Sequence, residues 1–244
     1  MVRKTKGIVL RSVRYGETSL IVSVFTEDFG LQTYIINGVR TEKKNKEKSV
    51  LFMPASLLEL DVYHHEQRGI NRIREAVRYA VLHGLAEDVV KNNIALFMME
   101  LLFKSLKHPE SNLPLFTFCE KILSRLNDCD RDHAVVFPYY FSLHLPHFLG
   151  FGISPPEKSI CDSPTCCLDL TEGSFLNEYP VHDHYISGEE AKLAAMLLSE
   201  DQLSTGSNIS GIHMPEKFLD FYRLHIQDFG KIRSYGLLQE LLSH

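Results

Sequence analysis

At 244 residues with 44% hydrophobic content, the chain is long enough for two packed domains and too apolar for a disordered protein. No segment approaches the roughly 20 consecutive apolar residues of a membrane span, and no apolar signal core follows the N-terminus, so we expect a cytoplasmic protein. The net charge of −5 alone argues against a polyanion partner. Residues 1–80, however, carry 14 basic and 9 acidic side chains, net +5, and the remainder carries 12 and 22, net −10. This change of net charge along the chain indicates a basic module followed by an acidic one, with two differently solvated surfaces as the alternative.

Five runs of alternating apolar and polar residues fill the first eighty positions, with the period of half-buried strands. They span residues 5–13, 19–26, 31–37, 55–65 and 70–80. In the first run, the alternation places Ile8 and Leu10 on one face and Val9 and Arg11 on the other. Five short strands without a helix-length pattern between the early ones predict a closed β-barrel of the oligonucleotide-binding (OB) type, with an open sheet as the alternative.

From Asp88 the apolar residues recur at helical spacing, which predicts an amphipathic helix ending near Lys107. Its polar face is predicted to carry Lys91, Glu100 and Lys104.

Two further helices are predicted before the middle of the chain. One covers residues 116–126, and Asp130 is placed to cap another that runs to Gly150. Pro146 should kink the last turn of that helix. We expect the aromatic stripes of this region to form a core rather than a ligand site.

The amino-acid composition changes in the later part of the chain. Residues 151–186 are rich in Pro, Gly, Cys and His and predict loops with short strands. Ser187 and Glu190 match a capping box for a helix through Leu198. Two more helices are predicted over residues 215–228 and 234–242, the first with Pro215 in its first turn.

Together these patterns predict an α+β multidomain protein. The expected parts are an OB-type barrel (1–80), the first part of a helical domain (81–150), a loop-rich insertion resembling a degenerate zinc finger (151–186) and the C-terminal part of the helical domain (187–244).

The segment between the third and fourth strands is polar and basic. Its five cations are candidate phosphate contacts: Arg40, Lys43, Lys44, Lys46 and Lys48. Glu42 and Glu47 are interspersed, so a solvated loop is the alternative.

A second basic row lies on the fifth strand, where Arg72, Arg74 and Arg78 are predicted to share one face as a ladder for a nucleic-acid backbone. Aromatic residues of the barrel are candidates for base stacking, with core packing as the alternative for each. They are Tyr15, Phe25, Phe29, Tyr34 and Tyr63.

Cysteines and histidines of the insertion supply enough donors for a four-coordinate zinc. The candidate ligands are Cys161, Cys166 or its neighbour Cys167, His182 and His184. The spacing is irregular, and the alternative is a metal-free finger packed around Phe175, Leu176 and Tyr185. In a cytoplasmic chain we expect reduced thiols rather than disulfides.

Motifs for catalysis are absent from the sequence, which has no Gly-x-Ser-x-Gly, no phosphate-binding loop and no His-Glu-x-x-His. We therefore expect a protein that is not an enzyme.

The order and spacing of several short motifs resemble the bacterial recombination mediator family RecO over nearly the whole chain. The matching pieces are Gly7-Ile8-Val9-Leu10, Tyr15-Gly16-Glu17-Thr18-Ser19, Val24-Phe25-Thr26, Gly30, Gly38-Val39-Arg40, Leu149-Gly150-Phe151 and Ser234. This sequence departs from the family at Asn37, where a basic residue is common. It departs also in its cysteines, since the family's zinc element pairs two C-x-x-C units and this chain has Cys161-x4-Cys166-Cys167 with no second cysteine pair.

The resemblance implies an N-terminal OB fold, a helical domain and an inserted zinc-ribbon-like element. It also implies binding and annealing of single-stranded DNA, association with the nucleoid, contact with the C-terminal tail of the single-stranded-DNA-binding protein SSB, and partnership with RecR in loading the recombinase. With the second cysteine pair missing, we expect no cofactor and no stoichiometric zinc. We expect the SSB tail on the helices between Asp88 and Gly150, near a basic residue such as Lys104, Lys121, Arg125 or Arg131.

Two alternative functions stay open at this point. One is a protein-interaction scaffold with little DNA affinity, and the other is an OB-fold RNA-binding module of the translation apparatus, because a barrel fold alone carries no function.

Overall fold

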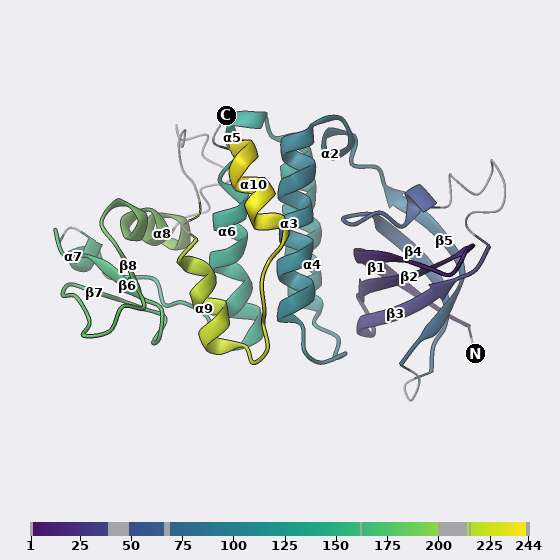
Figure 1. Ribbon diagram of the computed structural model, residues 1–244, viewed down its shortest axis with the longest axis horizontal. Coiled ribbons are helices and arrows are strands. Elements are labelled where there is room, and N and C mark those ends of the chain that lie inside the picture. Colours follow the sequence, from purple (N-terminus) through teal and green to yellow (C-terminus); the bar gives the residue numbers. More distant parts are fainter. Residues whose placement is uncertain are drawn as a thin grey trace. The chain divides into compact units, whose positions relative to one another are not determined.

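The computed structural model describes residues 2–38, 49–65, 69–161, 163–199, 214 and 216–242 (Figure 1). Its packing groups the chain into two compact units, Met1–Asp128 and Cys129–His244. Compact units follow packing and do not by themselves mark domain boundaries, so the boundaries expected from the sequence stay predictions. Each unit is described separately below.

The first unit contains the predicted five-stranded barrel, and the barrel is closed (Figure 1). Its strands are β1 (Val2–Tyr15), β2 (Ser19–Thr26), β3 (Gly30–Ile36), β4 (Leu57–Tyr63) and β5 (Asn71–Ala80). The hydrogen-bonded order is β1-β2-β3-β5-β4, with β1 pairing β4 to complete the circle. The pair β3–β5 is parallel and the other pairs are antiparallel. Because the circle of strand pairs is closed, the open-sheet alternative is excluded.

Side chains pointing into the barrel form its core. The buried members are Val9, Leu20, Val22, Val24, Tyr34, Phe52, Leu58, Leu60 and Val62. The predicted β2 alternation is confirmed on this face, since Leu20, Val22 and Val24 all point inward.

A bulge in β1 changes which residues share a face. Val9 lies opposite Val24, whereas Arg11 lies opposite Ser23, so Leu10 is an extra residue in the ladder. Arg11 is thereby turned to the outer face, where its Cζ lies 5.6 Å from the centroid of the Phe103 ring. The expectation that Val9 and Arg11 share a face is wrong, because the bulge reverses the alternation between them.

Three helices complete the first unit: α2 (His83–Glu87), α3 (Val89–Ser105) and α4 (Leu113–Asp128). The helix predicted from Asp88 is confirmed, and Asp88 caps α3 by accepting hydrogen bonds from the backbone N of Val90 at 2.7 Å and of Lys91 at 3.1 Å. The outer face of β2 packs on α4, where the ring centroids of Phe25 and Phe116 are 5.8 Å apart.

Lys91 was expected on the polar face of α3 and is instead buried, with 7% of its surface exposed. Its Nζ donates to the backbone O of Asn127 at 3.0 Å. The carbonyls of the last helical turn lack partners within the helix, so a cation at the end of α4 is stabilised there. The periodicity of α3 alone does not reveal this contact.

The second unit begins with two short α-helices and a 3-10 helix where one long helix was expected. They are α5 (Arg131–Ala134), α6 (Phe137–His144) and η1 (Leu145–Leu149). Asp130 caps α5 as predicted, with its Oδ1 2.8 Å from the backbone N of His133. Pro138 in the first turn of α6 and Pro146 in η1 lack an N–H, and the helix is interrupted before each of them.

Aromatic residues form the core of this unit, as predicted for Tyr139. The rings of Tyr139 and Phe218 meet edge to face with centroids 5.5 Å apart. The Tyr222 hydroxyl donates to the backbone O of Ser142 at 2.6 Å, so this buried polar group is satisfied.

The insertion contains α7 (Lys158–Cys161) and a three-stranded sheet of β6 (Cys167–Asp169), β7 (Ser174–Leu176) and β8 (Tyr185–Ser187). The prediction of loops and short strands is confirmed. The remaining helices are α8 (Glu189–Ser199), α9 (Phe218–His225) and α10 (Ser234–Leu242). Ser187 belongs to β8, and Pro215 lies outside the described residues. Within the described ranges, none of the helices is both long and apolar enough to cross a membrane.

The close approach of Gly30 to the connection between α3 and α4 gives a stability prediction. A Cβ at Gly30 would lie 2.1 Å from the backbone O of Glu110, and the φ of +63° already disfavours any other residue. We expect Gly30→Ala to lower the free energy of unfolding by more than about 2 kcal/mol, measured by urea denaturation.

The matched control is Gly16→Ala, at a similar φ of +61° but with no atom within 4 Å of the added methyl group. Gly16→Ala should lower the free energy of unfolding only by the cost of a left-handed backbone at a residue with a Cβ, about 1 kcal/mol. Equal losses in the two variants would show that the contact with Glu110 is unimportant.

Candidate nucleic-acid interface

The basic segment that the sequence singled out lies outside the described residues, but both of its flanks are fixed. This applies to Arg40, Lys43, Lys44, Lys46 and Lys48. On the near side, Asn37 Oδ1 accepts a hydrogen bond from Ser19 Oγ at 3.1 Å. On the far side, Arg78 Nη2 donates to the backbone O of Val50 at 2.6 Å. The described residues on both sides of the segment, Asn37 and Val50, are therefore held by the barrel, the second of them by Arg78.

The three arginines of β5 do not form the predicted single-face ladder. Arg72 lies opposite Tyr63 and Arg78 opposite Leu58, and these partners are an odd number of residues apart on β4. Residues directly opposite each other share a face, so Arg72 and Arg78 point to opposite faces. The cause is the register shift between Asp61 and Val62, which makes Arg74 an extra residue of β5 between Arg72 and Arg78.

All three β5 arginines are nevertheless exposed. Among the described residues, Arg72, Arg74 and Arg78 form no ion pair with a carboxylate. Their charges are therefore available to phosphates, although not along one line.

Tyr34 was a candidate for base stacking and is a core residue instead. It is fully buried in the barrel, so no base can reach its ring. Its buried hydroxyl has no hydrogen-bond partner among the described residues, and burial raises the pKa of Tyr34. Phe25 is buried as well, whereas 57% of Tyr15 and 43% of Tyr63 are exposed.

Sequence reasoning missed Arg14, which precedes Tyr15 at the end of β1. Both side chains are exposed, and Tyr15 lies opposite Ser19, the residue that holds Asn37. An arginine and an aromatic residue thus stand where the basic segment leaves the barrel. The signal in the sequence is an Arg-Tyr pair directly before the turn at Gly16.

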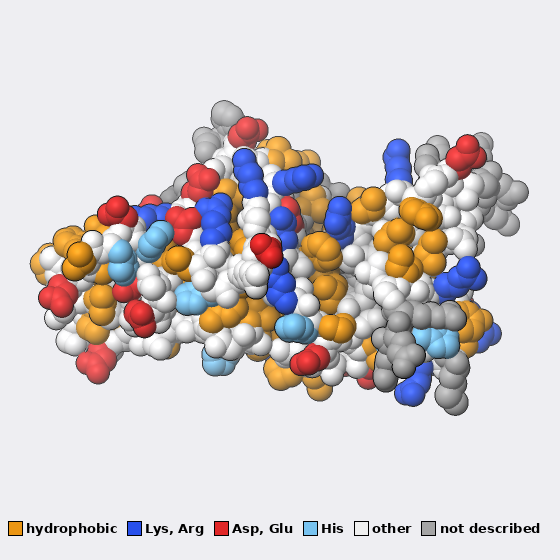
Figure 2. All heavy atoms as spheres, turned by 60° about the horizontal axis from the view of Figure 1, so that its bottom comes forward, with side chains coloured by type: hydrophobic (Ala, Val, Ile, Leu, Met, Phe, Trp, Pro, Cys, Tyr) orange, Lys and Arg blue, Asp and Glu red, His pale blue; other side chains and the backbone are white. Residues whose placement is uncertain are grey.

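One outer face of the barrel is acidic. A hollow of about 510 Å³ is lined by Lys4, Thr5, Lys6, Glu27, Asp28, Glu59, Leu60, Asp61, Glu75 and Val77. Its five carboxylates outnumber its two lysines, and Asp61 and Glu75 are directly opposite each other on β4 and β5. Phosphates are repelled from this face. The face in Figure 2 differs: there the barrel, on the right, shows Lys and Arg side chains at several places and little acidic surface.

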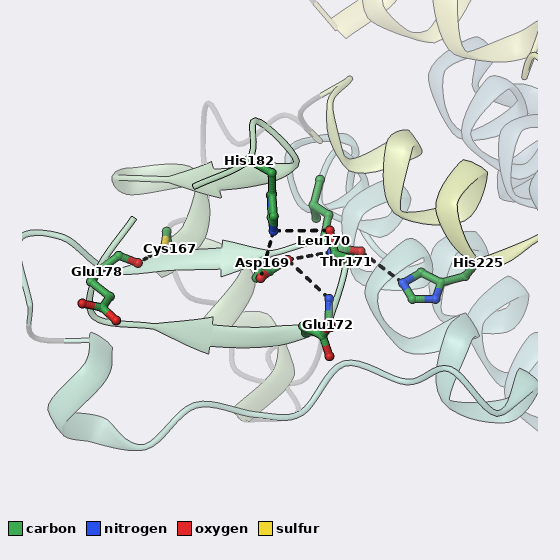
Figure 3. A network of polar contacts seen from close by, with 8 residues as sticks. All are labelled: Cys167, Asp169, Leu170, Thr171, Glu172, Glu178, His182 and His225. Carbon is green, nitrogen blue, oxygen red and sulfur yellow. Dashed lines mark hydrogen bonds and ion pairs between the residues drawn. The ribbon is translucent and has the colours of Figure 1, made fainter. Parts of the chain in front are cut away.

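The insertion is organised around Asp169, the last residue of β6 (Figure 3). Its buried carboxylate accepts hydrogen bonds from the backbone N of Thr171 at 2.7 Å and of Glu172 at 3.3 Å. His182 Nε2 lies 3.4 Å from Asp169 Oδ2, so one expected zinc ligand faces a carboxylate.

Among the described side chains, the remaining zinc candidates do not complete a set of ligands. Cys166 and Cys167 are buried, and Cys167 Sγ donates to the backbone O of Glu178 at 3.1 Å. Burial, followed by the neighbouring Cys166, raises the pKa of Cys167, which opposes the thiolate that zinc requires. The ring of His184 lies 6.1 Å from that of His182, and the side chain of Cys161 lies outside the described residues. No cluster of three His, Cys, Asp or Glu side chains suited to a metal occurs in the described part of the chain.

Comparison with known proteins covers most of the chain. Residues 1–79 match the family model described as recombination protein O N terminal, and residues 86–211 match recombination protein O C terminal. The DNA repair protein RecO of Phocaeicola vulgatus is 30% identical over 247 residues, covering 100% of both chains. That of Flavobacterium psychrophilum is 29% identical and covers 98% of this chain and 99% of its own length. That of Chloroherpeton thalassium is 28% identical over 261 residues.

The burial of Tyr34 predicts that its hydroxyl contributes nothing to stability. Tyr34→Phe removes an unsatisfied buried oxygen and should leave the free energy of unfolding unchanged or raise it by about 1 kcal/mol. Affinity for single-stranded DNA should stay the same. The control is Tyr222→Phe, which loses the hydrogen bond to Ser142 and should cost about 1 kcal/mol. A loss of DNA affinity in Tyr34→Phe would contradict the core assignment.

Proposed function

Because this chain belongs to the recombination protein O (RecO) family, with a role in DNA repair and recombination, we propose that it binds single-stranded DNA as a mediator and not as an enzyme. In this proposal it anneals complementary strands and, together with RecR, helps to load the recombinase on SSB-coated DNA. The observation that carries the proposal is the basic rim of the barrel. We use this name for the described residues Arg14, Tyr15 and Arg78; the cations of residues 39–48, between β3 and β4 in the sequence, lie outside the described residues.

The rim suits a ligand that is recognised by charge and by base stacking. Cations that neutralise phosphates release counterions and bind without sequence preference, and an exposed aromatic ring stacks on any base. Because Arg78 donates a hydrogen bond to the backbone O of Val50, its side chain is already ordered and loses less conformational entropy when DNA binds. Sequence-independent binding is what annealing of arbitrary strands requires.

The SSB tail is proposed to bind α4. Whereas α3 carries buried residues on all sides, α4 has one buried face and one exposed face. Lys121 and Arg125 lie one turn apart on its exposed side. They are suited to the acidic groups and terminal carboxylate of a tail peptide.

The first prediction from this proposal concerns salt dependence. Replacing Lys43, Lys44 and Lys46 together by Ala should flatten the slope of log affinity against log salt by about one to two units, since each engaged cation contributes about −0.7. The measurement is fluorescence anisotropy of a labelled single-stranded oligonucleotide over a range of salt concentrations. Arg40→Ala should cost more affinity than any single lysine, because guanidinium grips phosphate in a bidentate manner.

Lys4→Ala is the matched control, since it removes an exposed cation from the acidic hollow and should leave the slope unchanged. An unchanged slope in the triple variant would move the binding surface to Arg72, Arg74 and Arg78. A wild-type protein that binds no single strand at low salt would favour the scaffold, and preference for RNA in competition would favour the RNA-binding module.

The second prediction concerns the SSB contact. Lys121→Ala combined with Arg125→Ala should weaken binding of a labelled SSB tail peptide about tenfold or more, since two charged contacts are lost. Lys192→Ala, an exposed lysine of α8, serves as the control. Crosslinking of the peptide only to residues 1–80 would show the assignment to be wrong.

The third prediction is a protein without stoichiometric zinc, supported by the hydrogen-bonded state of Cys167 and His182. Metal analysis after dialysis should find well below one zinc per chain. About one zinc per chain, lost together with thermal stability in Cys161→Ser but not in Cys129→Ser, would overturn it.

A further inference from the structure

The surface that OB folds commonly use for oligonucleotides is partly closed in this protein. That surface consists of strands 2 and 3 with the loops joining strands 1–2 and 4–5. Here Phe25, on the outer face of β2, is fully buried and packs against Phe116 of α4. Ser23, two residues earlier on that face, has only 8% of its surface exposed. A DNA strand therefore cannot lie across β2.

The β3 part of the same surface stays open and forms one wall of a cleft. Leu31 lies opposite Phe25 and Thr33 opposite Ser23, so both point outward from β3. They line a hollow of about 530 Å³ whose other walls are the β4–β5 connection and the α3–α4 connection. We call it the rim cleft, and its lining residues are Asp28, Phe29, Leu31, Gln32, Thr33, His64, Gly69, Lys107, His108, Pro109 and Ser111.

We propose that the rim cleft binds a nucleotide of a DNA single strand, with its base against Phe29 and His64 and its phosphate beside Lys107 and His108. The inference rests on the proposed function and adds a second contact to it, distinct from the basic rim. The volume falls within the roughly 300–1,000 Å³ of pockets for small ligands.

Two aromatic rings provide the stacking surface. Phe29 and His64 are themselves stacked, with centroids 4.0 Å apart and planes inclined by 15°. Both rings line the cleft, and bases stack on such surfaces without regard to sequence. Gln32 and Ser111 add an amide and a hydroxyl that can hydrogen-bond to a base or a sugar.

With Lys107 and Asp28 as the two charged side chains among its lining residues, the cleft is near neutral, in contrast to the acidic hollow. Lys107 and His108 are exposed, and within the described ranges neither forms an ion pair with a carboxylate. Asp28 is the single carboxylate among the lining residues, compared with five in the acidic hollow. The two hollows differ in charge although Asp28 lines both of them, so a strand entering the cleft is directed away from the acidic hollow.

The strand can continue from the cleft along β3 towards Arg72. Arg72 lies beside Ile35 in the parallel pair of β3 and β5, and Ile35 shares the outer face of Thr33. An exposed arginine thus stands on the same face as the cleft wall. In this arrangement Arg72 can contact the strand by itself, although it does not form the predicted ladder with Arg74 and Arg78.

The cleft is preorganised on the side that carries Phe29. The backbone N of Phe29 donates to Thr26 Oγ1 at 3.1 Å, and its backbone O accepts from Gln32 Nε2 at 2.7 Å. Thr26 Oγ1 in turn donates to the backbone O of Gly30 at 2.9 Å. Gly30 approaches Glu110 closely, which sets the α3–α4 connection against the start of β3 (Figure 1). A rigid turn lowers the entropy lost when a base binds.

The test combines two variants of the full chain with a crosslinking experiment. Lys107→Ala should flatten the salt slope for a labelled oligothymidylate by about 0.7, and Lys4→Ala, an exposed lysine of the acidic hollow outside the cleft, should not. Phe29→Leu keeps an apolar side chain against the barrel and should weaken binding about tenfold, or about 1.4 kcal/mol. An iodouracil-substituted oligonucleotide should crosslink to Phe29 or His64.

The outcomes separate this inference from the proposed function. If the wild-type protein binds the oligonucleotide but both variants bind with wild-type affinity and salt slope, and crosslinks map elsewhere, the rim cleft is wrong and the proposed function stands. If the wild-type protein does not bind at all, both fail. If Phe29→Leu also lowers the thermal unfolding temperature, its weaker binding could reflect lost stability. The salt slope of Lys107→Ala and the positions of the crosslinks then decide whether the rim cleft binds DNA.

Discussion

The packing of Phe116 on Phe25 is the contact on which the first unit depends. Phe25 is on the outer face of β2, where a free barrel would expose it to water. Burying one such side chain contributes about 1.5–3 kcal/mol. Polar contacts fix α4 in the same place, since Tyr79 donates to Glu120 Oε1 at 2.5 Å and the backbone N of Gly84 donates to Asn127 Oδ1 at 2.8 Å. The barrel, α2 and α4 are therefore joined by apolar and polar contacts within one compact unit.

This packing also decides where a ligand can bind. A helix that covers β2 removes half of the usual OB surface and leaves the β3 side and the ends of the barrel. Charge narrows the choice of binding surface further, because five carboxylates from β4, β5 and the β2–β3 turn line one hollow of the outer face. Cations remain at the ends of strands and in the α3–α4 connection. The net positive charge of residues 1–80 thus indicated a module that binds anions. Which surfaces of the barrel carry the cations could be seen only from the fold.

Strand positions could be predicted from the sequence, whereas side-chain directions could be predicted only up to the first bulge. Residues 19–26 and 234–242 coincide with β2 and α10, because alternation and helical spacing are local signals. The extra residues Leu10 and Arg74 carry no such signal, and each reverses the faces of the residues that follow it, in β5 as far as the next register shift after Arg78. Predictions that depended on parity, such as the arginine ladder, failed for this reason.

The insertion shows how a small sheet can hold its shape through hydrogen bonds and burial. Zinc ribbons use a metal to fix turns that have little core beneath them. Here the turn after β6 is fixed by the Asp169 carboxylate, which accepts from two backbone N–H groups. Leu168, Phe175 and Ile186 are buried beneath the three strands. The sequence showed the irregular cysteines but not Asp169, because an aspartate at a strand end is too common to distinguish. In the described insertion, the turn after β6 is thus fixed by a carboxylate and two backbone N–H groups, whatever the cysteines do.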